Sequence, residues 1–426
     1  MELAEDVKTS LQKLPSRRVQ ELVVEVLQEL KWVGVEEIEV TPGSSLGDGL
    51  MALIYRVRAT GRLARAEKAR ASFVVKHTPR NKARRDVFDV PMLFANEHSF
   101  YENVVPALSR HCGPLAVAKF FHSITDGEHD ALILEDLKEQ SFRLADRRKG
   151  LDLRHCRVVL AALARLHAAS FVLKEKNAAA FEQLRPRVKD MFWDADREFA
   201  FKPFTTSCFE ETLRTLKAYF GGDDHENKYI EAFLRLSERG YDFIAASVRS
   251  TASRLQVVTH GDCWTNNLLF KYADEQPDSP SDVRFLDYQL TRITTPAADV
   301  TYFLFTSPKC QTMTDNYDHL LNSYHASFSS ILEQHHMDPE KIFSRRCLDE
   351  EMARMAPYGL TSAGIVVPAV CVPPEFTPDM DKVLGQTRDD FVQEYAKQMK
   401  ADTPEARLQL ASLLKHCVDR GFFKDL

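Results

Sequence analysis

Hydrophobic positions in the first third of the chain predict a helical segment followed by a β-sheet. Apolar residues recur with a helical period over residues 7–32, and Pro15 interrupts that period. Runs rich in β-branched and aromatic residues then predict strands, with a turn near Gly61 and one helix after the third strand. The strands are expected at Val35–Val40, Met51–Ala59, Ala71–Lys76, Ala116–Phe121 and Ala131–Leu134, and the helix at Phe88–Val104. This pattern predicts a sheet of about five strands with one main helix inserted.

From about residue 150 the chain is predicted to be mostly helical. Apolar residues recur every three or four positions over Leu151–Leu173, which indicates a long buried helix. Further helices are expected over residues 207–219, 226–248, 315–334, 385–400 and 404–422. Three short apolar runs interrupt this part as predicted strands, with a polar excursion between the last two: Leu255–Thr259, Asn267–Lys271 and Val283–Asp287. We therefore predict an α+β fold, with a hinge near Asp136–Arg143.

The composition is that of an ordinary globular protein, with 426 residues of which 44% are hydrophobic and 28% are charged. The net charge of -6 gives no reason to expect nucleic acid or an anionic membrane as a partner. The eight cysteines form no C-x-x-C pair and no zinc-site spacing, so free thiols in a reducing compartment are expected. Met1–Leu27 lacks the apolar core of a signal peptide, and the longest apolar stretch, Ala363–Val372, is too short to span a bilayer. A cytoplasmic protein is expected.

The most specific motif lies in the predicted hairpin, where residues 259–270 read THGDCWTNNLLF. Asn267 follows Asp262 by five positions, and Asp287 ends the next predicted strand. This spacing is typical of a kinase catalytic loop, in which the first Asp orients the acceptor hydroxyl and the other two residues hold Mg²⁺. The residue types suit that chemistry, because Mg²⁺ prefers oxygen ligands and a carboxylate beside the attacking oxygen can accept its proton. The alternative is a turn in which Asp and Asn only satisfy backbone donors.

With these motifs the chain resembles the ecdysteroid kinase-like family, also called the CHK kinase-like family. That family lies in the aminoglycoside phosphotransferase and choline kinase branch of the protein-kinase-like fold. The fragments that carry the resemblance run in the expected order between about Gly43 and Phe305: FVVKHTP, FANEHSFYENVVP, ILEDL, LARLHAAS, THGDCWTNNLLF and VRFLDYQL. The resemblance implies a bilobal fold, with an antiparallel sheet and one main helix in an N-lobe (residues 1–135). The larger, mostly helical C-lobe (residues 136–426) would contain the catalytic hairpin. ATP and Mg²⁺ are the implied cofactors, and the hydroxyl of a small molecule is the implied acceptor.

The resemblance also assigns roles in the N-lobe. Lys76 ends a predicted strand, where such a kinase places the lysine that contacts the α/β-phosphates, and Glu97 would be its ion-pair partner. Residues 56–86 contain eleven basic and two acidic residues, so a solvated basic hairpin is the alternative for Lys76. Glu135 and Leu137, in ILEDL, would belong to the hinge that contacts adenine through backbone groups. An end-of-strand turn is the alternative there.

The expected phosphate-binding loop departs from the family pattern. Gly43–Gly49 reads GSSLGDG rather than G-x-G-x-x-G, and Gly47 and Gly49 are its candidate nucleotide-contacting positions. The family usually has Gly-Asp-Asn here, followed three positions later by a hydroxyl residue, whereas this chain has Gly49 and Ala52. Either the two serines of this loop or backbone N–H groups supply the phosphate contact, or nucleotide affinity is weakened.

Other residues of the motifs are expected to support the site. Asp299 matches a family Asp that precedes an apolar helix, and it is either a support residue or a helix N-cap. His260 and His167 are expected to be structural. The aromatic residues of Tyr302–Phe305 either line an apolar acceptor pocket or form ordinary helix core.

Three functions remain open from the sequence. The first is an active kinase for an ecdysteroid or another sterol-like or xenobiotic alcohol. The second is a choline- or aminoglycoside-type kinase for a cationic substrate, which would need carboxylates at the acceptor end, such as Asp379, Asp381, Asp389 and Asp390. The third is a nucleotide-binding pseudokinase scaffold, against which the intact motif residues argue.

Overall fold

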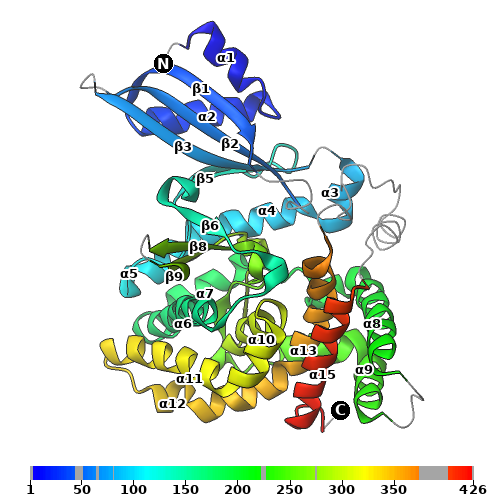
Figure 1. The fold of residues 1–426 in the computed structure, drawn as a ribbon. Coiled ribbons are helices and arrows are strands. Elements are labelled where there is room, and N and C mark those ends of the chain that lie inside the picture. Colours follow the sequence, from blue (N-terminus) through cyan, green and yellow to red (C-terminus); the bar gives the residue numbers. More distant parts are fainter. Residues whose placement is uncertain are drawn as a thin grey trace. The chain divides into compact units, whose positions relative to one another are not determined.

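The computed structural model describes residues 3–43, 51–63, 67–79, 81–221, 227–273, 276–373 and 402–424. The chain forms two compact units (Figure 1). Of the described residues, those within 3–101 and 117–143 form the first unit, and those within 102–116, 144–373 and 402–424 form the second. Residues 102–116, which the sequence prediction assigned to the N-lobe, belong to the second unit. The boundary near residue 135 stays a prediction.

The first unit is built on a five-stranded antiparallel sheet with the order β1-β2-β3-β5-β4. Two N-terminal helices cover one face of this sheet (Figure 1). The elements are α1 (Glu5–Leu11), α2 (Arg17–Glu29), β1 (Trp32–Pro42), β2 (Leu53–Leu63), β3 (Lys68–His77), α3 (Lys82–Phe88), α4 (Val90–Ser99), β4 (Phe120–Ile124) and β5 (Ala131–Glu135). The predicted break near Pro15 is confirmed, because Ser16 caps α2 by accepting a hydrogen bond from the Val19 N–H.

Successive side chains along each strand point to opposite faces of the sheet. One face forms the hydrophobic core, and the other carries a candidate functional residue. Val57 and Phe73 belong to the hydrophobic core formed with α1 and α2. Lys76 pairs across β2 and β5 with Ile54 and Leu132, so these three residues share the opposite face. The register of the sheet therefore decides which side of β3 presents Lys76.

Two sequence predictions in this unit are wrong in their limits. The turn expected near Gly61 is absent, because β2 continues through Gly61 and pairs with β1 and β3 there. Glycine is needed because a Cβ at this position would overlap the Gly34 carbonyl and the Trp32 ring. The fourth strand begins at Phe120 rather than at Ala116. Ala116 belongs to the second unit, in which its carbonyl accepts a hydrogen bond from the Phe285 N–H.

The second unit is mainly helical and contains the predicted hairpin. Its helices are α5 (Val105–Cys112), α6 (Leu153–Lys176), α7 (Ala178–Leu184), α8 (Glu198–Phe220), α9 (Lys228–Arg249), α10 (Pro296–Thr306), α11 (Cys310–Gln334), α12 (Pro339–Phe343), α13 (Arg345–Cys371) and α15 (Pro404–Asp419). Its strands are β7 (Val257–Thr259), β8 (Leu268–Ala273), β9 (Gln276–Phe285) and β10 (Arg292–Thr294). The short strand β6 (Phe142–Leu144) contains the point along the chain where the first unit ends. The helix expected over residues 385–400 lies outside the described residues.

The hairpin is tighter than expected and only two of its predicted strands pair. β8 and β9 are antiparallel, and the polar segment expected to loop out between them is largely β9. β7 instead pairs with β10, a strand that the sequence pattern did not predict. The α+β prediction as a whole is confirmed by the antiparallel sheet and the helical second unit.

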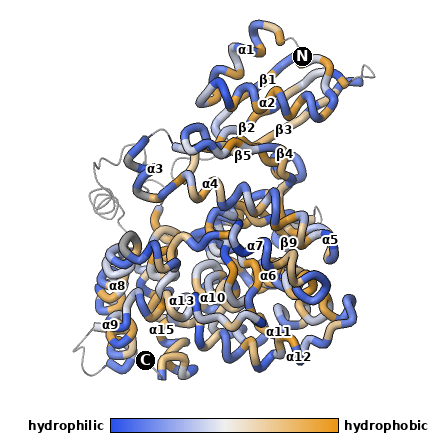
Figure 2. Tube along the Cα trace, turned by 180° about the vertical axis from the view of Figure 1, so that it is seen from behind, coloured by the Kyte–Doolittle hydropathy of each residue, from blue (hydrophilic) through white to orange (hydrophobic). Residues whose placement is uncertain are grey.

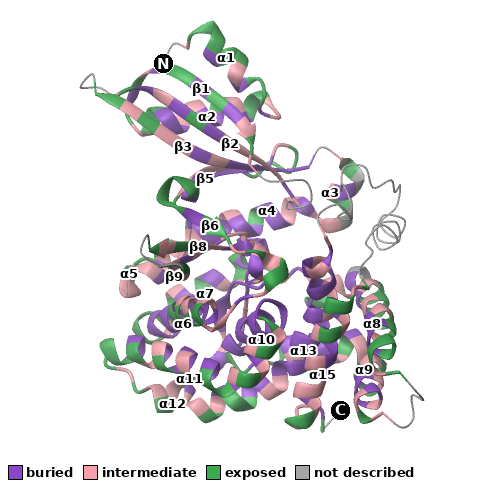
Figure 3. Ribbon diagram, in the orientation of Figure 1, coloured by how far each residue is buried: buried purple, intermediate pink, exposed green. Residues whose placement is uncertain are grey.

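Helices α6 and α10 form much of the interior of the second unit. α6 carries a hydrophobic middle (Figure 2) and packs against α11 and α10. Among the described residues α6 alone is apolar and long enough to cross a membrane, but 72% of its apolar window is buried inside the protein, as in the core helix of a soluble protein. Every residue of α10 is buried (Figure 3), and α13 packs against it.

Candidate active site

The loop between β7 and β8 places Asp262 and Asn267 side by side. The Asn267 amide donates hydrogen bonds to Asp262 Oδ2 at 3.0 Å and to the Asp262 backbone carbonyl at 2.9 Å. Tyr302 on α10 donates to the other carboxylate oxygen, Oδ1, at 2.5 Å. Because the Asn267 nitrogen faces Asp262, its amide oxygen is directed elsewhere and can serve as a metal ligand. The structure therefore brings together the first two residues of the predicted motif.

Pairing of β8 with β9 brings Asp287 to the same end of the hairpin. Leu268 pairs with Phe285, and the Leu286 N–H donates to the Asn267 carbonyl at 2.9 Å. Asp287 directly follows and adopts left-handed backbone angles, with φ 66° and ψ 70°. Such a conformation is uncommon outside glycine and is found at sites where a side chain must be aimed.

The donor set at this end of the hairpin fits Mg²⁺. Asn267 and Asp287 supply an amide oxygen and a carboxylate, and Mg²⁺ is often held by one or two carboxylates together with substrate phosphates. Among the described residues, no group of three or more His, Cys, Asp and Glu side chains is arranged to hold a metal. Asn267 and Asp287 are thus the residues that would hold the metal, and Mg²⁺ in proteins generally keeps water ligands and binds substrate phosphates as well.

The surroundings of Asp262 bring the pKa of its carboxyl group close to neutral pH. Burial raises its pKa to about 7, the hydrogen bond from Tyr302 opposes that rise, and the negative charge of Asp287 adds to it. A carboxylate with such a pKa is suited to accepting a proton from a hydroxyl at physiological pH.

Asp299 anchors the backbone of the same loop from α10. Its carboxylate accepts hydrogen bonds from the His260 N–H at 2.6 Å, from the Gly261 N–H at 2.9 Å and from His167 Nε2 at 3.1 Å. Burial would raise the pKa of Asp299, but these hydrogen bonds and the nearby histidines hold it below its usual range. The N-cap of α10 is Thr295, so the N-cap interpretation of Asp299 is wrong and the support role is observed.

The two histidines of the motifs have internal hydrogen-bonding roles. The His260 Nδ1 atom accepts from the Asp262 N–H at 3.1 Å, and Nε2 donates to the Leu286 carbonyl at 3.1 Å. His167 Nδ1 accepts from the Tyr324 hydroxyl at 2.8 Å. Burial lowers the pKa of His260, in accord with a neutral ring that joins the two halves of the site.

We expect Gly261→Ala to destabilise the protein and to lower its activity. Gly261 has φ +87°, and a Cβ there would overlap the carbonyl oxygen of Leu290. The left-handed backbone and the clash together should lower the free energy of unfolding by roughly 2 kcal/mol or more, measured by urea denaturation. Gly127→Ala is the matched control, because Gly127 has φ +83° but no neighbouring atom within 4 Å. Equal losses in the two variants would contradict a tight fit of the loop against Leu290.

In the first unit Lys76 and Glu97 form the predicted ion pair. Lys76 Nζ on β3 lies 2.5 Å from Glu97 Oε2 on α4, and the two side chains are 7% and 1% exposed. A solvated basic hairpin is therefore wrong for Lys76. Basic residues elsewhere in the sheet do pair at the surface, as Arg58 on β2 does with Glu39 and Glu139.

The segment after β5 is held by a buried cluster around Asp136. The Asp136 carboxylate accepts from Arg56 Nε at 2.6 Å, from the Ser72 hydroxyl at 2.8 Å and from the Lys138 N–H at 3.2 Å. Burial would raise the pKa of Asp136, but the hydrogen bonds from Arg56 and Ser72 hold it below its usual range. This cluster fixes the backbone between Glu135 and Leu137, the two residues assigned to adenine contact, and that assignment stays a prediction.

Other candidates of the sequence analysis are only partly described. Gly47 and Gly49 lie outside the described residues, as do the four acidic candidates for a cationic acceptor site. Ala52 is described and buried. The aromatic residues Tyr302, Phe303 and Phe305 are buried in α10, and Tyr302 is the one whose hydroxyl reaches Asp262.

Sequence reasoning missed the hydrogen-bonding roles of Tyr302 and Arg292. Tyr302 lies three residues after Asp299, so both share one face of α10, and that helical spacing was an available signal. Arg292 is buried, donates to the Gly261 carbonyl at 3.3 Å and lies 3.9 Å from Asp190. No pattern in the sequence indicates the role of Arg292, because its partners come from distant segments.

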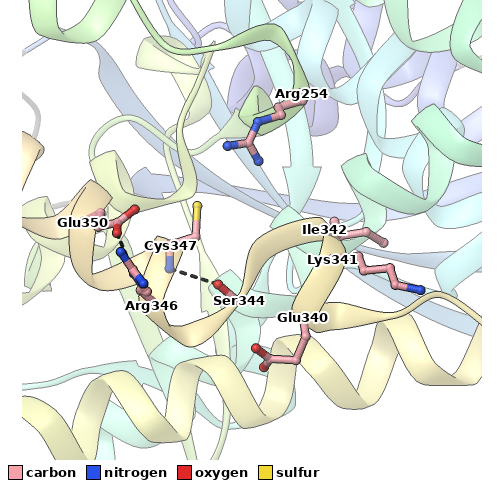
Figure 4. Close-up of a pocket in the computed structure, with 8 residues that line it drawn as sticks. All are labelled: Arg254, Glu340, Lys341, Ile342, Ser344, Arg346, Cys347 and Glu350. Atoms are coloured by element: carbon pink, nitrogen blue, oxygen red, sulfur yellow. Dashed lines mark hydrogen bonds and ion pairs between the residues drawn. The ribbon is translucent and has the colours of Figure 1, made fainter.

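A cavity in the second unit is separate from these residues (Figure 4). It has a volume of about 290 Å³ and is formed by α12, the start of α13 and Arg254. Its lining is mostly charged, and Arg346 is paired with Glu350. None of the predicted catalytic or metal-binding residues lines it.

The arrangement of Asp262, Asn267 and Asp287 on an α+β scaffold is typical of kinase-like proteins. Within that class, the chain belongs to the ecdysteroid kinase-like family, whose family model matches residues 46–337. The family prediction is thus confirmed. No curated protein sequence matches the chain.

Two solved structures match the chain at low identity. An ethanolamine kinase from Plasmodium vivax is 9% identical, with a TM-score of 0.42 over 96% of this chain and 97% of that chain. An aminoglycoside 2'-phosphotransferase IIIa variant in complex with GDP is 10% identical, with a TM-score of 0.39 over 90% of this chain and 96% of that chain.

Proposed function

We propose that the protein transfers the γ-phosphoryl group of ATP to a hydroxyl group of a small molecule, with Mg²⁺ as its metal. The observation that supports this most strongly is the convergence of Asp262, Asn267 and Asp287 at one end of the β8–β9 hairpin. Membership of the ecdysteroid kinase-like family supports it independently. The intact Lys76–Glu97 pair argues against a pseudokinase scaffold.

In this mechanism the protein contributes mainly placement and electrostatics. Asp262 orients the acceptor hydroxyl and accepts its proton as the oxygen–phosphorus bond forms and the bond to the β-phosphate oxygen breaks. Asn267 and Asp287 would hold Mg²⁺, which neutralises phosphate charge when bound. Lys76, kept in place by Glu97, would contact the α/β-phosphates.

The acceptor we favour is an ecdysteroid or another sterol-like or xenobiotic alcohol. The family name supports this class. The buried surroundings of Asp262 are aromatic, because Tyr302 bonds its carboxylate and packs against the ring of Tyr358 with centroids 6.3 Å apart. We propose a cytoplasmic location on the composition and the eight free cysteines.

An ATP-consumption screen over ecdysteroids, other sterols, choline and aminoglycosides tests the proposal. We expect MgATP to raise the melting temperature and an ecdysteroid or sterol alcohol to stimulate ATP consumption. Asp287→Ala should lose the Mg²⁺-dependent part of the nucleotide stabilisation, whereas Asp282→Ala, a change at a partly exposed position on β9, should keep it. Consumption of choline or aminoglycosides alone would favour the cationic-substrate kinase. No consumption and no MgATP shift would favour the scaffold.

A further inference from the structure

Helix α10 reaches the catalytic loop at two different points. Asp299 binds the loop backbone at His260 and Gly261, as described above. Tyr302 is one helical turn further on and reaches the loop side chain, with its hydroxyl 2.5 Å from Asp262 Oδ1. One rigid, fully buried helix therefore sets both the backbone and the side chain of the loop.

The carboxylate of Asp262 is held at both of its oxygens. Asn267 donates to Oδ2 at 3.0 Å, and Tyr302 donates to Oδ1. The χ2 torsion of aspartate has a broad energy minimum, so a carboxylate bonded at one oxygen can still rotate. Bonds at both oxygens restrict that rotation. The two oxygens have about four lone-pair sites together, so the hydrogen bonds from Asn267, Tyr302 and Trp264 still leave one for an acceptor hydroxyl that donates to the carboxylate.

The phenol of Tyr302 is itself fixed by its surroundings. The side chain is buried, and its ring packs at 6.3 Å against the ring of Tyr358. The Tyr358 hydroxyl accepts from Arg292 Nη1 at 3.3 Å, and Arg292 Nη2 donates to the Gly261 carbonyl at 3.3 Å. Burial and the charge of Asp262 raise the pKa of Tyr302 well above its usual value, so the hydroxyl remains a donor.

We infer that Tyr302 is a positioning residue for phosphoryl transfer, which holds the Asp262 carboxylate in the orientation that receives the acceptor hydroxyl. This inference rests on the proposed function, because it requires Asp262 to act on the acceptor. Small errors in the placement of a reacting group lower the rate without weakening nucleotide binding. Tyr302 should therefore affect the turnover number rather than the affinity for ATP.

Tyr302→Phe tests the inference, because it removes the hydroxyl and keeps the ring. With an ecdysteroid as the acceptor, we expect kcat to fall roughly 10- to 100-fold. The KM for ATP and the melting shift with MgATP should change by less than about 2-fold. Turnover is expressed per nucleotide-binding site, so that a loss of folded protein does not imitate a loss of kcat.

Tyr317→Phe is the matched control for removing a buried hydroxyl in the same unit. Tyr317 is 2% exposed, and its hydroxyl bonds to none of the described residues. Its loss should leave kcat within about 2-fold of the wild type. Equal kcat values in Tyr302→Phe and Tyr317→Phe would overturn the positioning role and leave the proposed function intact. A wild-type protein that consumes no ATP with any acceptor would overturn the proposed function itself.

A double-variant cycle measures the contact even without turnover. We expect the melting temperature to fall less when Tyr302→Phe is added to Asp262→Ala than when it is made in the wild type, because the partner oxygen is already absent. Additive shifts would show that Tyr302 does not act through Asp262 and would overturn the inference.

Discussion

Asp262→Asn should abolish turnover while the protein still binds nucleotide. The substitution keeps the size of the side chain but removes the carboxylate that accepts the proton of the acceptor hydroxyl. We expect kcat to fall by at least about 100-fold, as is usual when a general base is lost. ATP consumption with the acceptor identified in the screen measures the first effect, and the melting shift with MgATP measures the second.

Asp282→Asn is the matched control for this variant. Asp282 lies on β9, is partly exposed and pairs with Arg284, so it has the same chemistry outside the site. Its replacement should leave turnover within about 2-fold of the wild type. Wild-type activity in Asp262→Asn would refute the mechanism, because no other described residue has been assigned the role of base.

Asp299→Ala should destabilise the second unit and inactivate the site together. The substitution leaves the N–H groups of His260 and Gly261 and the ring of His167 without their buried acceptor. We expect a loss of about 3–5 kcal/mol in the free energy of unfolding, which corresponds to a drop of roughly 10 °C in melting temperature. Thermal unfolding monitored by circular dichroism measures this loss.

The stability that Asp299 contributes should decrease at acidic pH. The pKa of Asp299 is lower in the folded protein than its usual value, so the stabilisation is present at neutral pH. It should be lost as the pH falls below the usual range of aspartate and through the lowered pKa. Asp299→Ala should accordingly flatten the acid limb of the stability profile.

Asp338→Ala is the control for removing a carboxylate that accepts backbone hydrogen bonds. Asp338 caps the short α12 by accepting from the Glu340 N–H at 3.1 Å, and its side chain is 48% exposed. Its loss should lower the free energy of unfolding by about 1 kcal/mol or less. A similar small effect for Asp299→Ala would mean that the loop does not depend on this anchor.

The hydrophobic pattern of the sequence predicted most of the helices and strands that have one regular apolar face buried in the protein. α6, α11 and the five strands of the first sheet were all expected, because local hydrophobic periodicity and tertiary burial agree in them. α13 was not predicted, because it contains Pro357 and Pro368, which normally interrupt a helix. Most of its residues are buried, and the packing outweighs the hydrogen bonds that the prolines remove.

The candidate site was predictable only where its residues lie close together in a motif. Asp262, Asn267 and Asp287 follow from spacing, because a single hairpin joins them. The contacts made by Tyr302 and Arg292 could not be predicted in this way. They link segments that are between 31 and 102 residues apart, as the contacts of Arg292 with Gly261 and Asp190 show.

The sequence by itself determined the family, the α+β class and the residue types available for chemistry, because these depend on composition, local period and motif spacing. Only the tertiary structure decided that Asp299 anchors the loop backbone and that Tyr302 holds the catalytic carboxylate. Helix α10 can do both because long-range packing buries it completely beside the loop. Such packing depends on many distant contacts at once, and no short stretch of sequence records it.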